Sequence, residues 1–247
     1  MTVSREGGIR RGQVLEIVPE STDVTLRVRW EDGQETRINP ARELGLRVSR
    51  NRFFRPRPGR YDSRTFLLRS LPRKSVGAEV GVWKGDFAAE MLHIVRPSRL
   101  YLVDPWEFMP DSRHAHTRYG GSIARSREDM ENVLRSVQER FSSKIGRGVV
   151  HIHRGTLQSL AAVQDPPLLD WVYIDGDHNY EAVTSDLRTA ARMVRPGGYI
   201  TGDDYREDGW WKDAVVSAVH QLMRSGEVEL ELVKRSQYIL RRTFAST

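Results

Sequence analysis

The chain has 247 residues, of which 38% are hydrophobic and 29% are charged, and its formal net charge is +6. This composition is typical of a globular protein, and the length accommodates one α/β domain with a small additional unit. The chain contains no cysteine, which excludes disulfides, thiolate metal sites and a cysteine nucleophile.

Neither a membrane nor a nucleic acid is expected as a partner. No apolar run approaches the roughly 20 residues that span a bilayer, and residues 1–11 lack the apolar core of a signal peptide, so we expect a cytoplasmic protein. Eleven basic and two acidic residues lie between Arg42 and Lys74. Such a run can attract nucleic acid, but a charge run alone more often marks a solvated segment. We interpret residues 49–69 as a basic linker.

The first 48 residues predict a small antiparallel β unit. Apolar and polar side chains alternate through residues 24–30, which is the pattern of a half-buried strand. Asp32-Gly33 is a hairpin-turn signal, and residues 13–18 and 35–38 are plausible flanking strands. No catalytic constellation is found in this unit, so we interpret it as a packing or docking module.

From residue 70 to the end of the chain, strand and helix patterns alternate. The expected strands are residues 76–81, 100–103, 149–152, 169–174 and 199–201. The expected helices are residues 86–95, 130–141, 180–194 and 211–222. This alternation predicts a doubly wound α/β fold, with a mostly parallel sheet between two layers of helices. Two last strands, at 228–233 and 238–241, are joined by a short turn and must pair antiparallel, which makes seven strands.

The end of the first parallel strand carries the candidate cofactor loop. It contains Glu79, Gly81 and Gly85, at the sheet edge where doubly wound folds bind their ligands. Glycines let the backbone turn tightly and approach a ligand closely. The loop lacks the G-x-G-x-x-G pattern of a diphosphate site. It can still flank an amino acid moiety, and the acidic Glu79 suits an ammonium group.

Two further positions fit the nucleoside part of such a cofactor. Asp104 ends the second strand, 23 residues after Gly81, where a carboxylate can accept both hydrogen bonds of a ribose diol. A turn aspartate before proline is the alternative interpretation. Gly155 and Thr156 follow the third strand, where an adenine ring would lie, and Asp175, which follows the fourth strand, is a further candidate for contact with the cofactor. Thr156 is equally suited to cap the next helix.

Three carboxylates are expected to converge at the same edge. Asp175 follows the fourth strand, and Asp203 and Asp204 follow the fifth, while neighbouring strands lie about 4.8 Å apart. Carboxylate oxygens with open positions suit Mg²⁺ or a similar hard cation. Helix capping would explain one of the three but not all. His178 lies beside this cluster and is a candidate general base, although Asp175 could take the proton itself.

These motifs resemble a known group of enzymes, the metal-dependent sugar O-methyltransferases of macrolide and aminocoumarin biosynthesis, and more distantly the catechol type. The resemblance covers about residues 70–242, and it is carried by Asp175-Gly176-Asp177-His178-Asn179-Tyr180-Glu181-Ala182-Val183, Asp186-Leu187, Pro196-Gly197-Gly198 and Gly202-Asp203-Asp204-Tyr205. The antiparallel hairpin at the end of the sheet also matches class I methyltransferases.

The resemblance implies a class I S-adenosylmethionine-dependent methyltransferase domain at residues 70–247. It implies a divalent metal on Asp175, Asp203 and Asp204, with His178 or Asp175 as the base. It also implies a mobile lid at residues 106–121. The expected reaction is methyl transfer to a hydroxyl of a small molecule, such as a sugar, polyol or phenol.

Other interpretations of the sequence remain open at this point. The sheet and Asp104 also fit an NAD(P)-dependent oxidoreductase, although the missing third glycine and the terminal hairpin do not. A non-catalytic binding protein with a basic surface is a third alternative. The sequence is compatible with a homo-oligomer and does not name the methyl acceptor.

Overall fold

The computed structural model describes residues 2–5, 10–19, 24–30, 33–38, 46–49, 63–111, 114, 117–121, 123–209 and 211–244. For the described residues among 2–26, for residues 46–49 and for Ser63, only the course of the backbone is described.

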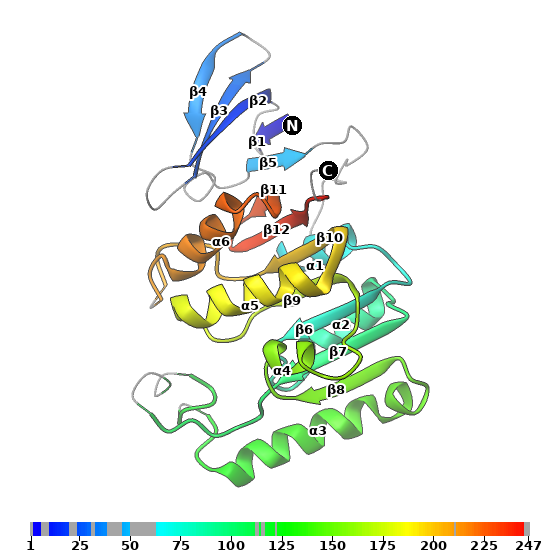
Figure 1. Cartoon of the computed structure of the whole chain (residues 1–247). Helices are drawn as coiled ribbons and strands as arrows, with labels where there is room; N and C mark the ends of the chain where they lie inside the picture. Colours follow the sequence, from blue (N-terminus) through cyan, green and yellow to red (C-terminus); the bar gives the residue numbers. More distant parts are fainter. Residues whose placement is uncertain are drawn as a thin grey trace.

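Five parallel strands form the centre of the main sheet (Figure 1). They are β6 (Val76–Val80), β7 (Arg99–Asp104), β8 (Val150–Arg154), β9 (Leu169–Ile174) and β10 (Val194–Gly202). An antiparallel hairpin of β11 (Val228–Lys234) and β12 (Gln237–Arg242) pairs with β10 through β12. The order across these seven strands is β11-β12-β10-β9-β6-β7-β8, which confirms the predicted sheet and its terminal hairpin.

Six helices accompany this sheet in the described part of the chain. They are α1 (Ser63–Ser70), α2 (Asp86–Ile94), α3 (Arg127–Gly146), α4 (Leu157–Ala161), α5 (Tyr180–Met193) and α6 (Ala214–Arg224). Two buried clusters show which helices share a face. Side chains of α4, α5 and α6 pack on one face, and those of α1, α2 and α3 on the other. The fold is therefore doubly wound, as predicted.

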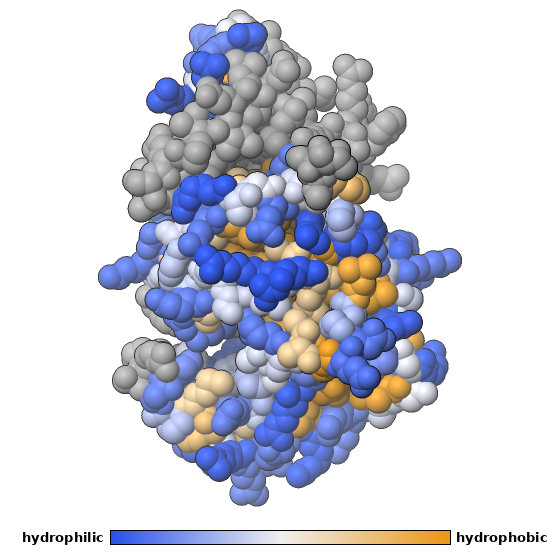
Figure 2. Space-filling model, viewed as in Figure 1, coloured by the Kyte–Doolittle hydropathy of each residue, from blue (hydrophilic) through white to orange (hydrophobic). Residues whose placement is uncertain are grey.

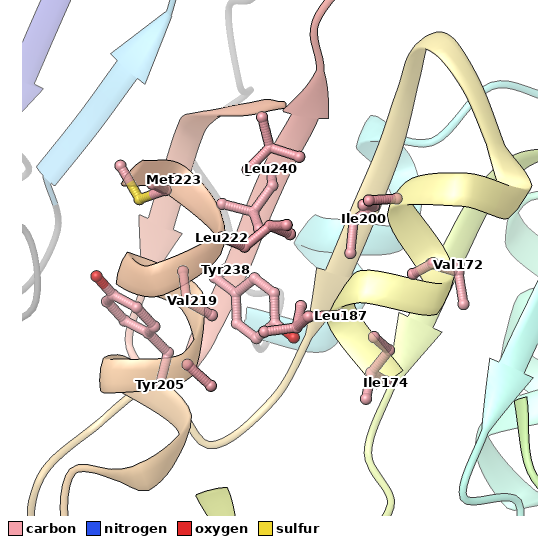
Figure 3. Packing of buried hydrophobic residues seen from close by; sticks show 14 of the residues in the cluster. Val172, Ile174, Leu187, Ile200, Tyr205, Val219, Leu222, Met223, Tyr238 and Leu240 are labelled. Carbon is pink, nitrogen blue, oxygen red and sulfur yellow. The ribbon is translucent and has the colours of Figure 1, made fainter. Parts of the chain in front are cut away.

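The strands alternate between these two clusters with the period of two that a sheet imposes. On β9, Val172 and Ile174 face α5 and α6, whereas Trp171 and Tyr173 face α1 and α2. Figure 3 shows the first of these faces, where the side chains of α5 and α6 point toward those of β9, β10 and β12. Both faces of the central strands are buried, so the polar side chains gather at the strand ends.

The amino-terminal residues form the predicted antiparallel β unit. Its strands are β1 (Thr2–Arg5), β2 (Arg10–Pro19), β3 (Val24–Trp30), β4 (Glu35–Ile38) and β5 (Leu46–Ser49). They are ordered β4-β3-β2-β1-β5, and β5 continues the sheet to β11 through the pair Arg47–Leu232. Gly33 has a φ of +82° in the hairpin turn, whereas Asp32 lies outside the described residues. The sequence pattern did not reveal β1 or β5.

Two elements differ from their predicted form. The strand β10 begins at Val194, before Pro196-Gly197-Gly198, because the chain bulges between Val194 and Tyr199 and then resumes pairing with β9. The helix α1, except for its last residue, lies within the segment that we interpreted as a linker. Its buried side chains, Phe66, Leu67 and Leu68, are consecutive, so they lack the spacing that marks an amphipathic helix.

Hydrophilic residues cover much of the described surface on the face shown in Figure 2, with apolar residues exposed in places over the middle of the molecule. Among the described residues, the most exposed large apolar side chains are Phe244 (71%) and Leu168 (65%). None of the described helices has the length and apolar character needed to cross a membrane.

Candidate functional site

The candidate site lies at the carboxyl ends of β6, β7, β9 and β10. Strand pairing sets this geometry, because Ile174 at the end of β9 lies beside Val80 of β6 and Gly202 of β10. The amide of Asp175 donates to the carbonyl of Val80 (2.8 Å), and that of Asp203 to the carbonyl of Ile174 (3.2 Å). The predicted convergence of acidic residues at one edge is therefore observed.

Glu79 is a buried carboxyl group, one oxygen of which accepts no hydrogen bond from the described residues. The side chain is 1% exposed, and its Oε2 has no hydrogen-bond partner among the described residues. Burial raises its pKa well above the usual value, and the nearby charges of Asp175 and Asp104 raise it further. A buried acceptor without a donor is costly. An ammonium group, as in the methionine part of S-adenosylmethionine, would satisfy it, so this residue fits the expected cofactor.

Backbone conformation and packing explain why two positions of the loop are glycines. Gly81 and Gly85 have φ values of +87° and +73°. A Cβ on Gly81 would lie 2.0 Å from the carbonyl oxygen of Asp175, and one on Gly85 would lie 2.7 Å from the Phe141 ring. Turn conformation and packing thus account for both residues. Contact with a cofactor stays a prediction for each.

Asp104 anchors the cofactor loop. Its Oδ2 accepts hydrogen bonds from the amides of Val82 and Trp83, both at 2.9 Å, and its Oδ1 accepts one from the amide of Trp106 at 2.7 Å. The side chain is 1% exposed. Burial raises the pKa of Asp104, although these hydrogen bonds and one from Tyr119 act in the opposite direction. The residue is both a turn aspartate and a well-oriented carboxylate at the strand end.

The segment predicted as a lid touches the site at two points. The hydroxyl of Tyr119 donates to Oδ2 of Asp104 at 2.5 Å, and its ring meets that of Trp83 edge-on with centroids 5.2 Å apart. His114 Nε2 lies 3.4 Å from Asp177 Oδ2. Sequence reasoning missed Tyr119, because no motif marks it. Its hydroxyl occupies one oxygen of the carboxylate that the sequence predicts to bind a ribose.

Gly155 and Thr156 lie close to Asp104. The amide of Gly155 donates to the backbone carbonyl of Asp104 (2.9 Å). The Thr156 hydroxyl accepts from the amide of Ser159 (3.2 Å) and forms a capping box at the start of α4. The capping role that we considered for Thr156 is therefore confirmed. Contact with adenine stays a prediction for both residues.

Asp175, His178 and Asp204 form a compact group. His178 Nε2 lies 2.5 Å from Asp204 Oδ2 and 3.8 Å from Asp175 Oδ1. The three candidate ligand atoms all lie within 4.8 Å of one another. Asp204 has a φ of +61°, a conformation that is uncommon for a residue with a side chain. Two carboxylate oxygens and an imidazole nitrogen are a donor set that suits a divalent cation, so the group fits one.

His178 is held as a cation in this arrangement. Burial alone would lower its pKa, but the hydrogen bond to Asp204 and the nearby carboxylate of Asp175 raise the pKa to about 9. Its ring also packs against that of Trp211, with centroids 4.9 Å apart. His178 therefore carries a proton at neutral pH. It can serve as a base only when another group compensates the two carboxylates.

Asp203 has different partners from the other two aspartates. Its Oδ2 accepts from Arg64 Nε (2.9 Å) and Nη2 (2.5 Å), and its Oδ1 accepts from the Ser236 hydroxyl (2.6 Å) and the amide of Asp204 (2.8 Å). Burial would raise the pKa of Asp203, but Ser236 and Arg64 bring it below its usual value. The structure thus groups His178, in place of Asp203, with Asp175 and Asp204.

Comparison with known proteins shows to which family the chain belongs. A family model described as a methyltransferase domain matches residues 78–205, slightly more than half of the chain. Over 81 residues, the chain is 36% identical to the uncharacterised protein R132 of Acanthamoeba polyphaga mimivirus. This match covers 32% of the chain and 36% of the viral protein, so the chain spans about a third of that relative's length.

Solved structures of methyltransferases share the fold. The O-methyltransferase NovP superposes with a TM-score of 0.50 at 20% identity, covering 73% of this chain and 80% of NovP. The O-methyltransferase TomG of Streptomyces achromogenes, solved with S-adenosylmethionine, gives a TM-score of 0.47 at 15% identity, with 73% and 78% covered. At 20% identity, the likeness to NovP shows the fold alone.

Proposed function

Because the chain belongs to the methyltransferase domain family, as a class I S-adenosylmethionine-dependent enzyme, we propose that it methylates a hydroxyl oxygen of a small molecule with the help of a divalent cation. The observation that carries this proposal is the group of Asp175, His178 and Asp204 at the strand ends. A hydroxyl group must lose its proton on methylation, and this group offers both a cation site and a proton acceptor. Family membership decides against the oxidoreductase alternative.

The methyl donor is assigned to the neighbouring strand ends. Glu79 offers an unpartnered buried oxygen to the ammonium group, and Asp104 offers its carboxylate to the ribose once the Tyr119 hydroxyl has left its Oδ2. Gly81 and Gly85 shape the loop between them. Asp104 and Glu79 need no contact with the cation, so binding of the donor and binding of the cation are separable.

Asp175 and Asp204 are proposed to hold the cation, and His178 to accept the proton of the hydroxyl. A bound divalent cation lowers the pKa of an acceptor hydroxyl and fixes its position. His178 Nε2 lies next to both carboxylates, so it can reach a hydroxyl placed between them. The acceptor class that fits has neighbouring oxygens, as sugars, polyols and catechol-like phenols do.

The proposal is tested by assaying a panel of such acceptors for formation of adenosylhomocysteine and of a methylated product. The assay contains S-adenosylmethionine and Mg²⁺. Methyl transfer to an oxygen of one panel member supports the proposal. Transfer to nitrogen or carbon, with the panel of hydroxyl compounds inert, contradicts it.

Tyr119→Phe is expected to strengthen adenosylhomocysteine binding, because the Tyr119 hydroxyl competes with the ribose for Oδ2 of Asp104. The phenyl ring can keep its packing against Trp83. Since hydrogen bonds to charged groups contribute about 1.5–3 kcal/mol and water offsets part of this, we expect a gain of roughly three- to tenfold in affinity. Calorimetry measures it. Weaker binding would mean that the hydroxyl contacts the cofactor instead of competing with it.

Asp104→Ala is expected to weaken adenosylhomocysteine binding by about 1.5–3 kcal/mol, the usual contribution of hydrogen bonds to a charged group. Because Asp104 also anchors the loop at Val82 and Trp83, the melting temperature is measured beside the affinity. Asp86→Ala serves as a control, since its exposed carboxylate lies at the start of α2 and pairs with Arg140. Unchanged affinity in a folded Asp104→Ala protein removes Asp104 from the site.

A further inference from the structure

Arg64 reaches the acidic cluster from the first turn of α1, outside the segment that matches the methyltransferase family. Its guanidinium contacts Asp203 Oδ2 through Nε (2.9 Å) and Nη2 (2.5 Å), and its Nη2 also lies 3.0 Å from Asp175 Oδ2. The group stands over the Phe87 ring, 5.2 Å from the centroid. One arginine thus bridges two of the three carboxylates.

These contacts use up the acceptor capacity of Asp203. Its Oδ1 already receives the Ser236 hydroxyl and the Asp204 amide, so four donors converge on one carboxylate. By contrast, Asp175 uses only Oδ2 for Arg64 and leaves Oδ1 on the side of His178. Arg64 therefore separates Asp203 from the oxygens that face the reacting side of the site.

The charges of the cluster also set Asp203 apart from Asp175 and Asp204. Arg64 keeps its positive charge at every pH at which proteins are folded. When His178 is neutral, as its role as a base requires, three carboxylates and one guanidinium leave two negative charges, which is the amount that a single divalent cation compensates. Without Arg64, a third unpaired carboxylate would remain beside the other two, and such groups repel one another strongly.

We propose that Arg64 is a positioning residue that serves as a built-in cation for Asp203 and restricts the site to one divalent cation on Asp175 and Asp204. The cation part of this inference rests on the proposed function. The side chain is fixed by α1, whose Phe66, Leu67 and Leu68 are buried in the core. The helix α1 therefore belongs to the methyltransferase domain. A domain that began at residue 70 would lack Arg64.

The first experiment compares melting temperatures of the full chain in EDTA. Arg64→Gln is expected to melt on the order of 5 °C lower than the parent protein, because a paired and partly buried carboxylate loses its cation. Arg73→Gln, just after the end of α1 and exposed, removes the same charge and should change the melting temperature little. Arg64→Lys keeps the charge without the two-nitrogen contact and should lie between them.

A second substitution distinguishes charge compensation from simple packing. In the double variant Arg64→Gln with Asp203→Asn, the uncompensated carboxylate is gone, so most of the lost melting temperature should return. A merely structural role of Arg64 would give no such rescue. If Arg64→Gln melts like Arg73→Gln, or if Asp203→Asn lowers the melting temperature of the double variant further, the inference is wrong.

The third measurement is a titration with Mn²⁺ alone, in which binding is monitored by electron paramagnetic resonance. The parent protein should bind one Mn²⁺ per chain. Arg64→Gln should bind a second Mn²⁺ or bind the first with at least threefold higher affinity. Mn²⁺ should also raise the melting temperature of Arg64→Gln by more than it raises that of the parent protein. An unchanged Mn²⁺ isotherm in Arg64→Gln overturns the restriction to one cation. If the parent protein binds no Mn²⁺ while the rescue in EDTA succeeds, the proposed cation dependence fails and the pairing of Arg64 with Asp203 stands.

Discussion

Removal of divalent cations is expected to abolish methyl transfer while leaving S-adenosylmethionine binding largely intact. The candidate cation ligands, Asp175 and Asp204, follow β9 and β10, whereas Glu79 and Asp104 lie on β6 and β7. The cation can therefore be removed without disturbing the side chains that are proposed to bind S-adenosylmethionine. Turnover with an accepted substrate is measured in EDTA and again after Mg²⁺ is restored. Calorimetry with adenosylhomocysteine under both conditions reports on the cofactor site.

Asp204→Asn should reproduce the effect of chelation at limiting Mg²⁺. The amide keeps the shape of the side chain but removes the charge that lies 2.5 Å from His178 Nε2. Loss of a group that only supports a metal ligand costs roughly 10–100-fold, so we expect loss of a ligand to cost at least about 100-fold. Asp208→Asn is the matched control, because Asp208 lies in the same loop and is 78% exposed.

The outcome that contradicts cation dependence is full activity in EDTA with no metal detected in the protein. The aspartates would then act through protons and hydrogen bonds alone. In that case Arg64 would be a resident cation of the cluster, since it already bridges Asp175 and Asp203.

The sequence predicted those parts of the site that depend on strand register. Asp104 ends one buried apolar strand, Asp175 and Asp203 follow two others, and the carboxyl ends of parallel strands meet at one edge of a sheet. Their positions therefore follow from the alternation of strands and helices. Thr156 was recognised as a cap for a similar reason, because its partner Ser159 lies within the same turn.

The parts that the sequence did not predict arrive through tertiary packing. Arg64 is 111 positions from Asp175 and reaches it because α1 docks on the sheet. Tyr119 belongs to an irregular segment, so no periodicity indicates that its hydroxyl contacts Asp104. The choice of His178 over Asp203 as neighbour of Asp175 depends on side-chain partners, namely Arg64 and Ser236. None of these contacts has a signature in local sequence.

His178→Ala is expected to lower the rate of methyl transfer by about 100- to 10,000-fold, the usual contribution of a general base. The affinity for Mn²⁺ should change by only a few fold if Asp175 and Asp204 are the ligands. The imidazole lies against both carboxylates and against the Trp211 ring, so it can take a proton from a hydroxyl bound between them. His151→Ala is the control, because His151 bonds to the carbonyl of Gly148, away from the acidic cluster.

The division between rate and metal affinity decides the role of His178. If the variant loses Mn²⁺ together with its activity, His178 is a ligand, as its distances to Asp175 Oδ1 and Asp204 Oδ2 also permit. If the rate is unchanged, Asp175 becomes the base, since its Oδ1 lies 3.8 Å from the position of the lost His178 Nε2. A slow variant that still binds Mn²⁺ and adenosylhomocysteine leaves proton transfer as the step that His178 performs, because both binding sites are then intact.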